Sequence, residues 1–130
     1  MNEPELSAEV RQLIYSSVPS IDALEVLIQM VRHPDVPRTV AELIEALRST
    51  AVTEPVVRES LALLRTQGIL SETPDGIVYR PDSPAVESAI GLLLRAYNER
   101  PVTLIRTVYA IADAKKIQAF ADAFKIKKDV

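Results

Sequence analysis

The chain contains no cysteine, no tryptophan, one histidine and three glycines among its 130 residues. The absence of cysteine excludes disulfides, thiolate metal sites and a cysteine nucleophile. One histidine cannot build a site that needs two imidazoles, and three glycines do not form a glycine-rich phosphate loop. We therefore expect no enzyme activity, no cofactor and no metal centre.

Long apolar runs are also missing. No stretch approaches the roughly 18 consecutive apolar residues that span a bilayer. The acidic N-terminus, Met-Asn-Glu-Pro-Glu, does not resemble a secretory signal. We expect a cytoplasmic protein without a membrane partner. With 48% hydrophobic and 25% charged residues, a chain of 130 residues can bury a core.

Basic charge is scarce outside the C-terminal end. The net charge is −3; residues 1–100 hold 15 acidic and nine basic side chains, and residues 101–130 hold three acidic and six basic ones. DNA binding depends largely on Lys and Arg at phosphates. The acidic balance of residues 1–100 therefore favours a protein partner, whereas the Lys-rich end would add nonspecific phosphate attraction or a partner contact.

The first third of the chain has helical periodicity. Apolar residues recur at helical spacing in residues 7–15 and again behind Ser20, a predicted N-cap. The loop 32–38 carries two prolines and must leave the helix. The predicted inner residues are Val10, Leu13 and Ile14 in the first helix and Ile21, Leu24, Leu27, Ile28 and Val31 in the second.

Two further helices are predicted at residues 39–47 and 53–67. Thr39 and Glu42 form a capping-box pattern at the start of the first, and Thr53 caps the second. Proline in the first turn of the second helix costs little, because no N–H is needed there. The predicted inner face of this helix consists of Val57, Leu61 and Leu64.

A β-hairpin is predicted directly after these helices. Gly68 ends the preceding helix, and the short β-type runs Ile69–Leu70 and Ile77–Tyr79 flank a turn at Thr73–Gly76. Helix, turn, helix and hairpin in this order are the layout of a winged helix-turn-helix domain. We predict a mostly α fold with a small β-hairpin.

The remainder of the chain is predicted to be helical. A helix begins at Ser83 and reaches about Arg100, Pro101 breaks it, and helical periodicity resumes over 102–112. Asp113 is predicted to cap a separate final helix.

These helices suggest a division of the chain and an interface. We assign residues 1–82 to the winged-helix domain with its N-terminal helix and residues 83–130 to a helical extension. The apolar residues of the extension exceed what the domain core needs, which favours a homodimer. The alternative is that the helices fold back onto their own core. The predicted interface residues are Leu104, Ile105, Val108, Ile117, Phe120 and Phe124.

A family resemblance is carried by Leu43, Leu47, Val52, Thr53, Val57, Leu61, Leu64 and Gly68-Ile69-Leu70. On these residues, segment 20–80 resembles the winged-helix module of the MarR-like and ArsR-like bacterial transcription regulators. The C-terminal tail is similar to tails on small uncharacterised bacterial winged-helix proteins. The resemblance implies a DNA-binding regulator whose helix 53–67 enters the major groove. A dimer would present two such helices to a pseudo-palindromic site.

The predicted DNA-binding residues are Thr53, Glu54, Val56, Arg58, Arg65 and Arg80. Against this function, the 47–52 turn is long, the exposed helix face also carries Glu59, and the hairpin turn at Glu72–Asp75 is acidic. These departures support the alternative, a winged-helix protein-interaction module without specific DNA binding. A positive surface on helix 53–67 would favour DNA, and a neutral or negative one would favour a protein partner.

Overall fold

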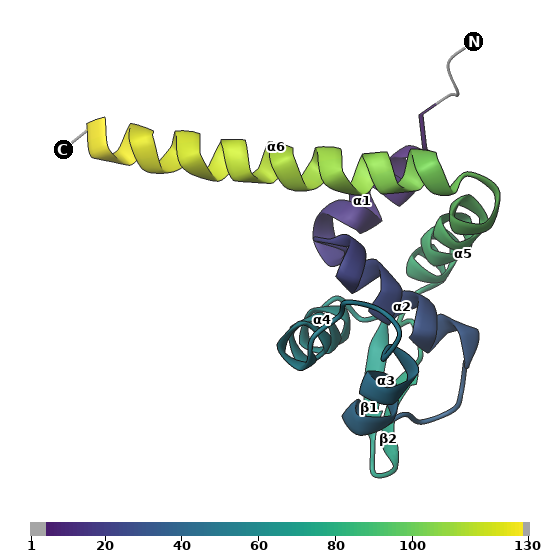
Figure 1. Cartoon of the computed structure of the whole chain (residues 1–130). Helices are drawn as coiled ribbons and strands as arrows, with labels where there is room; N and C mark the ends of the chain where they lie inside the picture. The colour runs from purple at the N-terminus through teal and green to yellow at the C-terminus, as the bar shows by residue number, and fades with distance from the viewer. Residues whose placement is uncertain (1–4, 129–130) are drawn as a thin grey trace.

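A computed structural model describes the backbone of residues 5–128 and the side chains of residues 5–125 (Figure 1). Within that range the chain forms six helices and one two-stranded antiparallel sheet. The elements are α1 (Ala8–Ser17), α2 (Ile21–Arg32), α3 (Val40–Ala46), α4 (Glu54–Thr66), β1 (Leu70–Thr73), β2 (Gly76–Tyr79), α5 (Pro84–Glu99) and α6 (Pro101–Lys128). The prediction of a mostly helical fold with a small hairpin is confirmed.

α2 lies at the centre of the molecule, with a wide apolar face that is buried (Figure 1). The sequence pattern predicted a single apolar stripe, but α3, α4, α6 and β2 all pack against this helix. Its polar residues Asp22, Glu25, Gln29 and Arg32 share one face and are only partly covered or exposed. The buried residues of α2 are Ala23, Leu24, Val26, Leu27, Ile28 and Met30.

Local side-chain signals fix where the helices begin. The Oγ of Ser20 accepts a hydrogen bond at 3.1 Å from a backbone N–H three residues on. Thr39 and Glu42 form the predicted capping box: Thr39 Oγ1 accepts from the Glu42 N–H at 3.1 Å, and a Glu42 carboxylate oxygen accepts from the Thr39 N–H at 3.3 Å. Thr53 occupies the predicted N-cap position, but its side chain makes no capping hydrogen bond.

The hairpin is held to the rest of the fold by a contact that the sequence did not reveal. β1 and β2 pair in a register that aligns Thr73 with Gly76. On the outer side of β2, the backbones of Arg38 and Ile77 exchange two hydrogen bonds of 2.8 Å. Gly76 has a φ of +140°, and a Cβ there would lie 2.7 Å from the Arg38 carbonyl oxygen. Only glycine therefore fits where the hairpin meets the segment before α3.

A single hydrophobic core joins the regions on either side of the predicted domain boundary at residue 82. Ile90 and Leu93 of α5 and Leu104 and Val108 of α6 belong to the same hydrophobic cluster as the inner residues of α1 to α4. The boundary at residue 82 therefore does not coincide with a break in the core. We refer to residues 5–116 as the body, because α6 contacts α1 and the start of α2 as far as Lys116.

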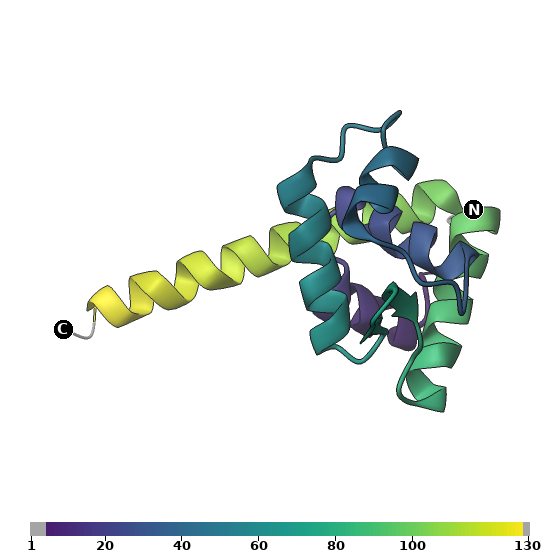
Figure 2. The same ribbon diagram turned by 90° about the horizontal axis from the view of Figure 1, so that it is seen from below.

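α6 is one continuous helix of 28 residues, so the prediction of a new helix at Asp113 is wrong. Pro101 stands in its first turn, where proline is tolerated, and residues 102–128 contain neither glycine nor proline. Aspartate in a run of good helix formers is not enough to end a helix. Lys115 still contacts Tyr15 of α1, and the remaining turns of the helix project from the body in both views (Figures 1 and 2).

No single described helix is long and apolar enough to cross a bilayer. α1 and α2 reach the required length and composition only when taken together, and the chain bends by 105° between them.

Candidate functional site

The outer face of α4 is an exposed surface that lies beside the hairpin. Val57, Leu61 and Leu64 are buried as predicted, because α4 packs its inner face against α2, α3 and β1. The exposed residues of α4 are Glu54, Pro55, Arg58, Glu59, Ala62, Arg65 and Thr66. A 13-residue helix is therefore held in place by one face and open to a partner along the other.

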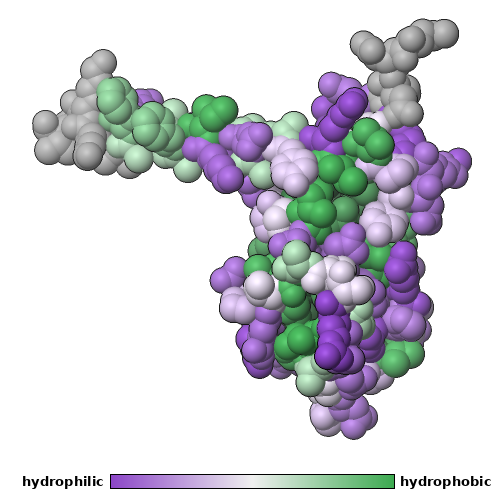
Figure 3. Space-filling view, in the orientation of Figure 1, coloured by the Kyte–Doolittle hydropathy of each residue, from purple (hydrophilic) through white to green (hydrophobic). Residues whose placement is uncertain are grey.

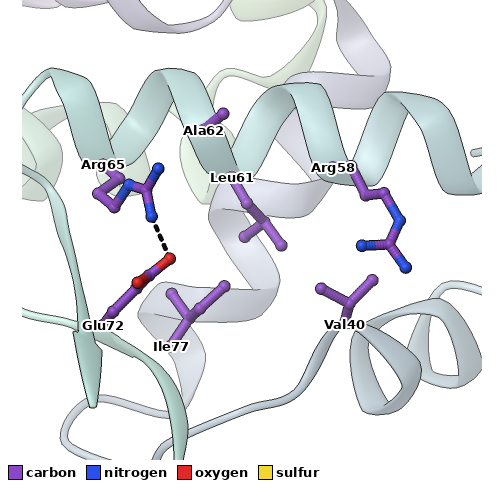
Figure 4. A pocket seen from close by; sticks show the side chains of 7 residues that line it. All are labelled: Val40, Arg58, Leu61, Ala62, Arg65, Glu72 and Ile77. Carbon is purple, nitrogen blue, oxygen red and sulfur yellow. Dashed lines mark hydrogen bonds and ion pairs between the residues drawn. The ribbon is translucent and has the colours of Figure 1, made fainter. Parts of the chain in front are cut away.

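A groove of about 160 Å³ separates α4 from the hairpin. Figure 4 shows Arg58 and Arg65 at opposite ends of this groove, with Leu61 between them. Small-molecule pockets usually enclose about 300–1,000 Å³, so the groove is too small for a ligand of ordinary size. The lining residues are Val40, Arg58, Leu61, Ala62, Arg65, Glu72 and Ile77.

Both arginines of the groove are engaged in ion pairs. Arg58 donates to Glu54 one turn earlier in α4 at 3.0 Å, and Arg65 pairs with Glu72 of β1. All four side chains are more than half exposed. Exposed pairs of this kind contribute only about 0–1 kcal/mol, because water and salt screen them. Each guanidinium can exchange its carboxylate for another anion at little cost.

The predicted DNA-binding residues fall in different environments. Thr53, Glu54, Arg58 and Arg65 are exposed on α4, and Arg80 is exposed after β2, away from the groove. Val56 is half-buried at the edge of the helix. The middle of the outer face is instead formed by Glu59, Ala62 and Thr66, which our list of predicted residues omitted. Their spacing of three and four residues, opposite the buried face, was the signal that could have identified them.

The charge around this surface is close to balanced. Residues 38–80, which span α3, α4 and the hairpin, hold five arginines against six carboxylates. The turn of the hairpin contributes an exposed Asp75. By the criterion stated for helix 53–67, a surface without net positive charge favours a protein partner. The exposed helix face therefore suits DNA binding, whereas the balanced charge favours a protein partner.

Other polar groups add little chemistry. Within residues 5–128, no group of three or more His, Asp or Glu side chains is placed to hold a metal ion. His33 is exposed in the loop after α2. One guanidinium nitrogen of Arg38 is buried without a hydrogen-bond partner in the described part of the chain. Burial, and then the negative charge of Glu87, raises the pKa of Tyr79 above its ordinary value.

The six predicted interface residues divide into two groups. Leu104 and Val108 are 0% and 1% exposed, so they belong to the body core and have no surface to offer a partner. For these two residues the fold-back alternative is correct. Ile105, Ile117, Phe120 and Phe124 are exposed on α6, and so are Val102 and Tyr109, which the prediction omitted.

Comparisons of the chain with protein-family models, with curated proteins and with solved structures find no match.

Proposed function

We propose that the chain is a cytoplasmic DNA-binding transcription regulator of the winged helix-turn-helix type, with α4 as its recognition helix. The observation that carries this proposal is the outer face of α4, exposed along its length beside an anchored hairpin. A helix of 13 residues is about 20 Å long, and the major groove of B-DNA admits a helix.

The ion pairs of α4 do not prevent this function. Arg58 and Arg65 can leave Glu54 and Glu72 for phosphates or base edges, because exposed pairs are weak. Arg80, after β2, is available to a phosphate. The remaining carboxylates would repel the duplex, so we expect a shallow salt dependence and modest affinity for nonspecific DNA.

The balanced charge favours a second candidate function, a module that binds another protein. In that case Arg58, Arg65 and Glu72 would form a polar rim around an apolar floor made by Leu61 and Ile77. A rim of charges around apolar contacts is the usual anatomy of a protein interface.

Binding to duplex DNA distinguishes the two candidates. Fluorescence anisotropy with a labelled random-sequence duplex, at several salt concentrations, measures affinity and the number of phosphate contacts together. Glu59→Lys should strengthen binding to any duplex, because it replaces repulsion by attraction in the middle of the outer face. On a selected specific site, Arg58→Ala should weaken binding by about 1–3 kcal/mol if the guanidinium reads a base.

Arg95→Ala is the matched control. Arg95 pairs with Glu99 on α5 at 3.2 Å, in the same one-turn geometry as Arg58 and Glu54. The Arg95→Ala variant should leave DNA binding unchanged. If Glu59→Lys and Arg58→Ala also change nothing, α4 is not a DNA reader and the protein-interaction function replaces it.

A further inference from the structure

α6 carries an exposed apolar stripe on the side opposite the residues that it packs into the core. The side chains of Leu104, Val108 and Ile111, spaced by four and three residues, face the core, and α1, α2 and α5 pack against the helix. The large apolar side chains on the opposite side are 40–74% exposed, and they are Val102, Ile105, Tyr109, Ile117, Phe120 and Phe124. Figure 3 shows apolar surface along the projecting end of the helix.

The area of the stripe is at the upper end of what a monomer exposes. It extends over 23 residues, from Val102 to Phe124, a rise of about 33 Å along the helix. An aromatic side chain presents about 150–250 Å² when uncovered and an aliphatic one less, so the exposed fractions correspond to on the order of 600 Å² of apolar surface. The largest patch on a typical monomer is about 300–600 Å², and a standard interface covers about 800 Å² per partner. The area suits a protein interface along the whole helix.

Two charged residues interrupt the stripe at its middle and decide its orientation. Asp113 and Lys116 lie between Tyr109 and Ile117; both are exposed, and with Tyr109 they border a shallow pocket beside the start of α2. If two copies of α6 paired in parallel, each Asp113 would face the other Asp113 and each Lys116 the other Lys116. Antiparallel pairing instead brings opposite charges together, which is how charged positions select partner and orientation in paired helices.

We propose that a second copy of this chain covers the stripe, with the two α6 helices antiparallel and their two-fold axis between residues 114 and 115. In this register Asp113 of each copy meets Lys116 of the other. Tyr109 meets Phe120 of the second copy, and Ile105 meets Phe124. The projecting half of each helix lies along the exposed outer side of its partner where that partner joins its own body. This pairing is independent of what α4 binds.

Sedimentation and light scattering test the pairing itself. The full chain should be a dimer at micromolar concentration, and Phe120→Asp should weaken dimerisation by roughly 100-fold or more, because it buries an unpaired charge. Gln118→Asp, on the opposite side of the same helix, is the matched control and should stay dimeric. A full-length chain that remains monomeric overturns the proposal. A monomer that binds vesicles with anionic lipid would assign the stripe to a membrane surface instead.

Disulfide trapping tests the register, and the absence of native cysteine makes it unambiguous. In the proposed pairing, residues 109 and 120 of different copies meet, whereas two copies of residue 120 lie about 16 Å apart along the axis. A mixture of Tyr109→Cys and Phe120→Cys chains should therefore cross-link on oxidation, and neither variant alone should do so. Efficient cross-linking of Phe120→Cys alone would show parallel pairing and overturn the register.

Charge exchange gives a second test that keeps every apolar contact. Asp113→Lys places like charges together twice and should weaken dimerisation about tenfold. Adding Lys116→Asp in the same chain restores opposite charges and should recover the affinity. Failure of the double variant to recover it would overturn the proposed contact between residues 113 and 116.

Discussion

Both halves of α6 expose large apolar side chains, but only the first half also has an apolar face that is covered by the body. In the first half, Leu104 and Val108 are completely covered by α1, α2 and α5. In the second half, Phe120 is 74% exposed and Phe124 is 60% exposed. Helical spacing identifies an apolar face equally well in both halves. It does not identify what covers that face, because the cover comes from elements distant in the sequence or from another molecule.

The sharpest way to test this contrast is to truncate one large side chain in each half. Leu104→Ala should lower the free energy of unfolding by about 2–5 kcal/mol, because it leaves a cavity in the body core. Ile117→Ala, measured in the monomeric Phe120→Asp background, should cost less than about 0.5 kcal/mol, as is usual for surface changes. Chemical denaturation measures both losses, by comparing Leu104→Ala with the native chain and the double variant Phe120→Asp, Ile117→Ala with Phe120→Asp. Equal losses would mean that the projecting half is packed in solution.

A second contrast concerns Gly76 and Gly91: an added Cβ would clash at the first and would meet no atom at the second. Gly76→Ala should destabilise the fold by about 1–3 kcal/mol, because the backbone is strained for other residues and the new Cβ would meet the Arg38 carbonyl. A Cβ at Gly91 on α5 meets nothing within 4 Å. Gly91→Ala should therefore stabilise by about 0.5–1 kcal/mol through helix propensity. Thermal unfolding of the two variants checks both signs.

The smallest effect is expected where a side chain is only partly covered. Tyr79 has a raised pKa in the folded state, so the native protein keeps a proton that the unfolded chain releases near pH 10. Its contribution to stability is present below about pH 10 and is lost as the pH rises through the folded-state pKa. The free energy of unfolding should therefore fall less steeply with pH in Tyr79→Phe than in the native chain. A parallel decline in both proteins would contradict the burial of the phenol.

Local signals predicted the fold better than they predicted the surfaces. The caps at Ser20 and Thr39, the helix end at Gly68 and the buried face of α4 depend on neighbours in the sequence, and the structure has them. The bridge between Arg38 and Ile77 depends on residues far apart in the chain, so no local pattern indicates it.

The candidate sites were harder to predict for the same reason. Arg58 and Arg65 do lie on the accessible side of α4, but the pairing of Arg65 with Glu72 requires the hairpin to be in place. Val56 was assigned to the outer face and is half-buried, while Glu59 at its centre was left out of the assignment. For Leu104, the decision between core and interface required the position of α1.

Because α6 is uninterrupted, the register of the proposed dimer would fix the distance between the two bodies. With the axis between residues 114 and 115, the two Leu104 residues, which anchor the helices to their bodies, would be about 32 Å apart along the helices. A slip of one heptad would change the separation by about 10 Å. The charges at residues 113 and 116 would thus set a length as well as a partner.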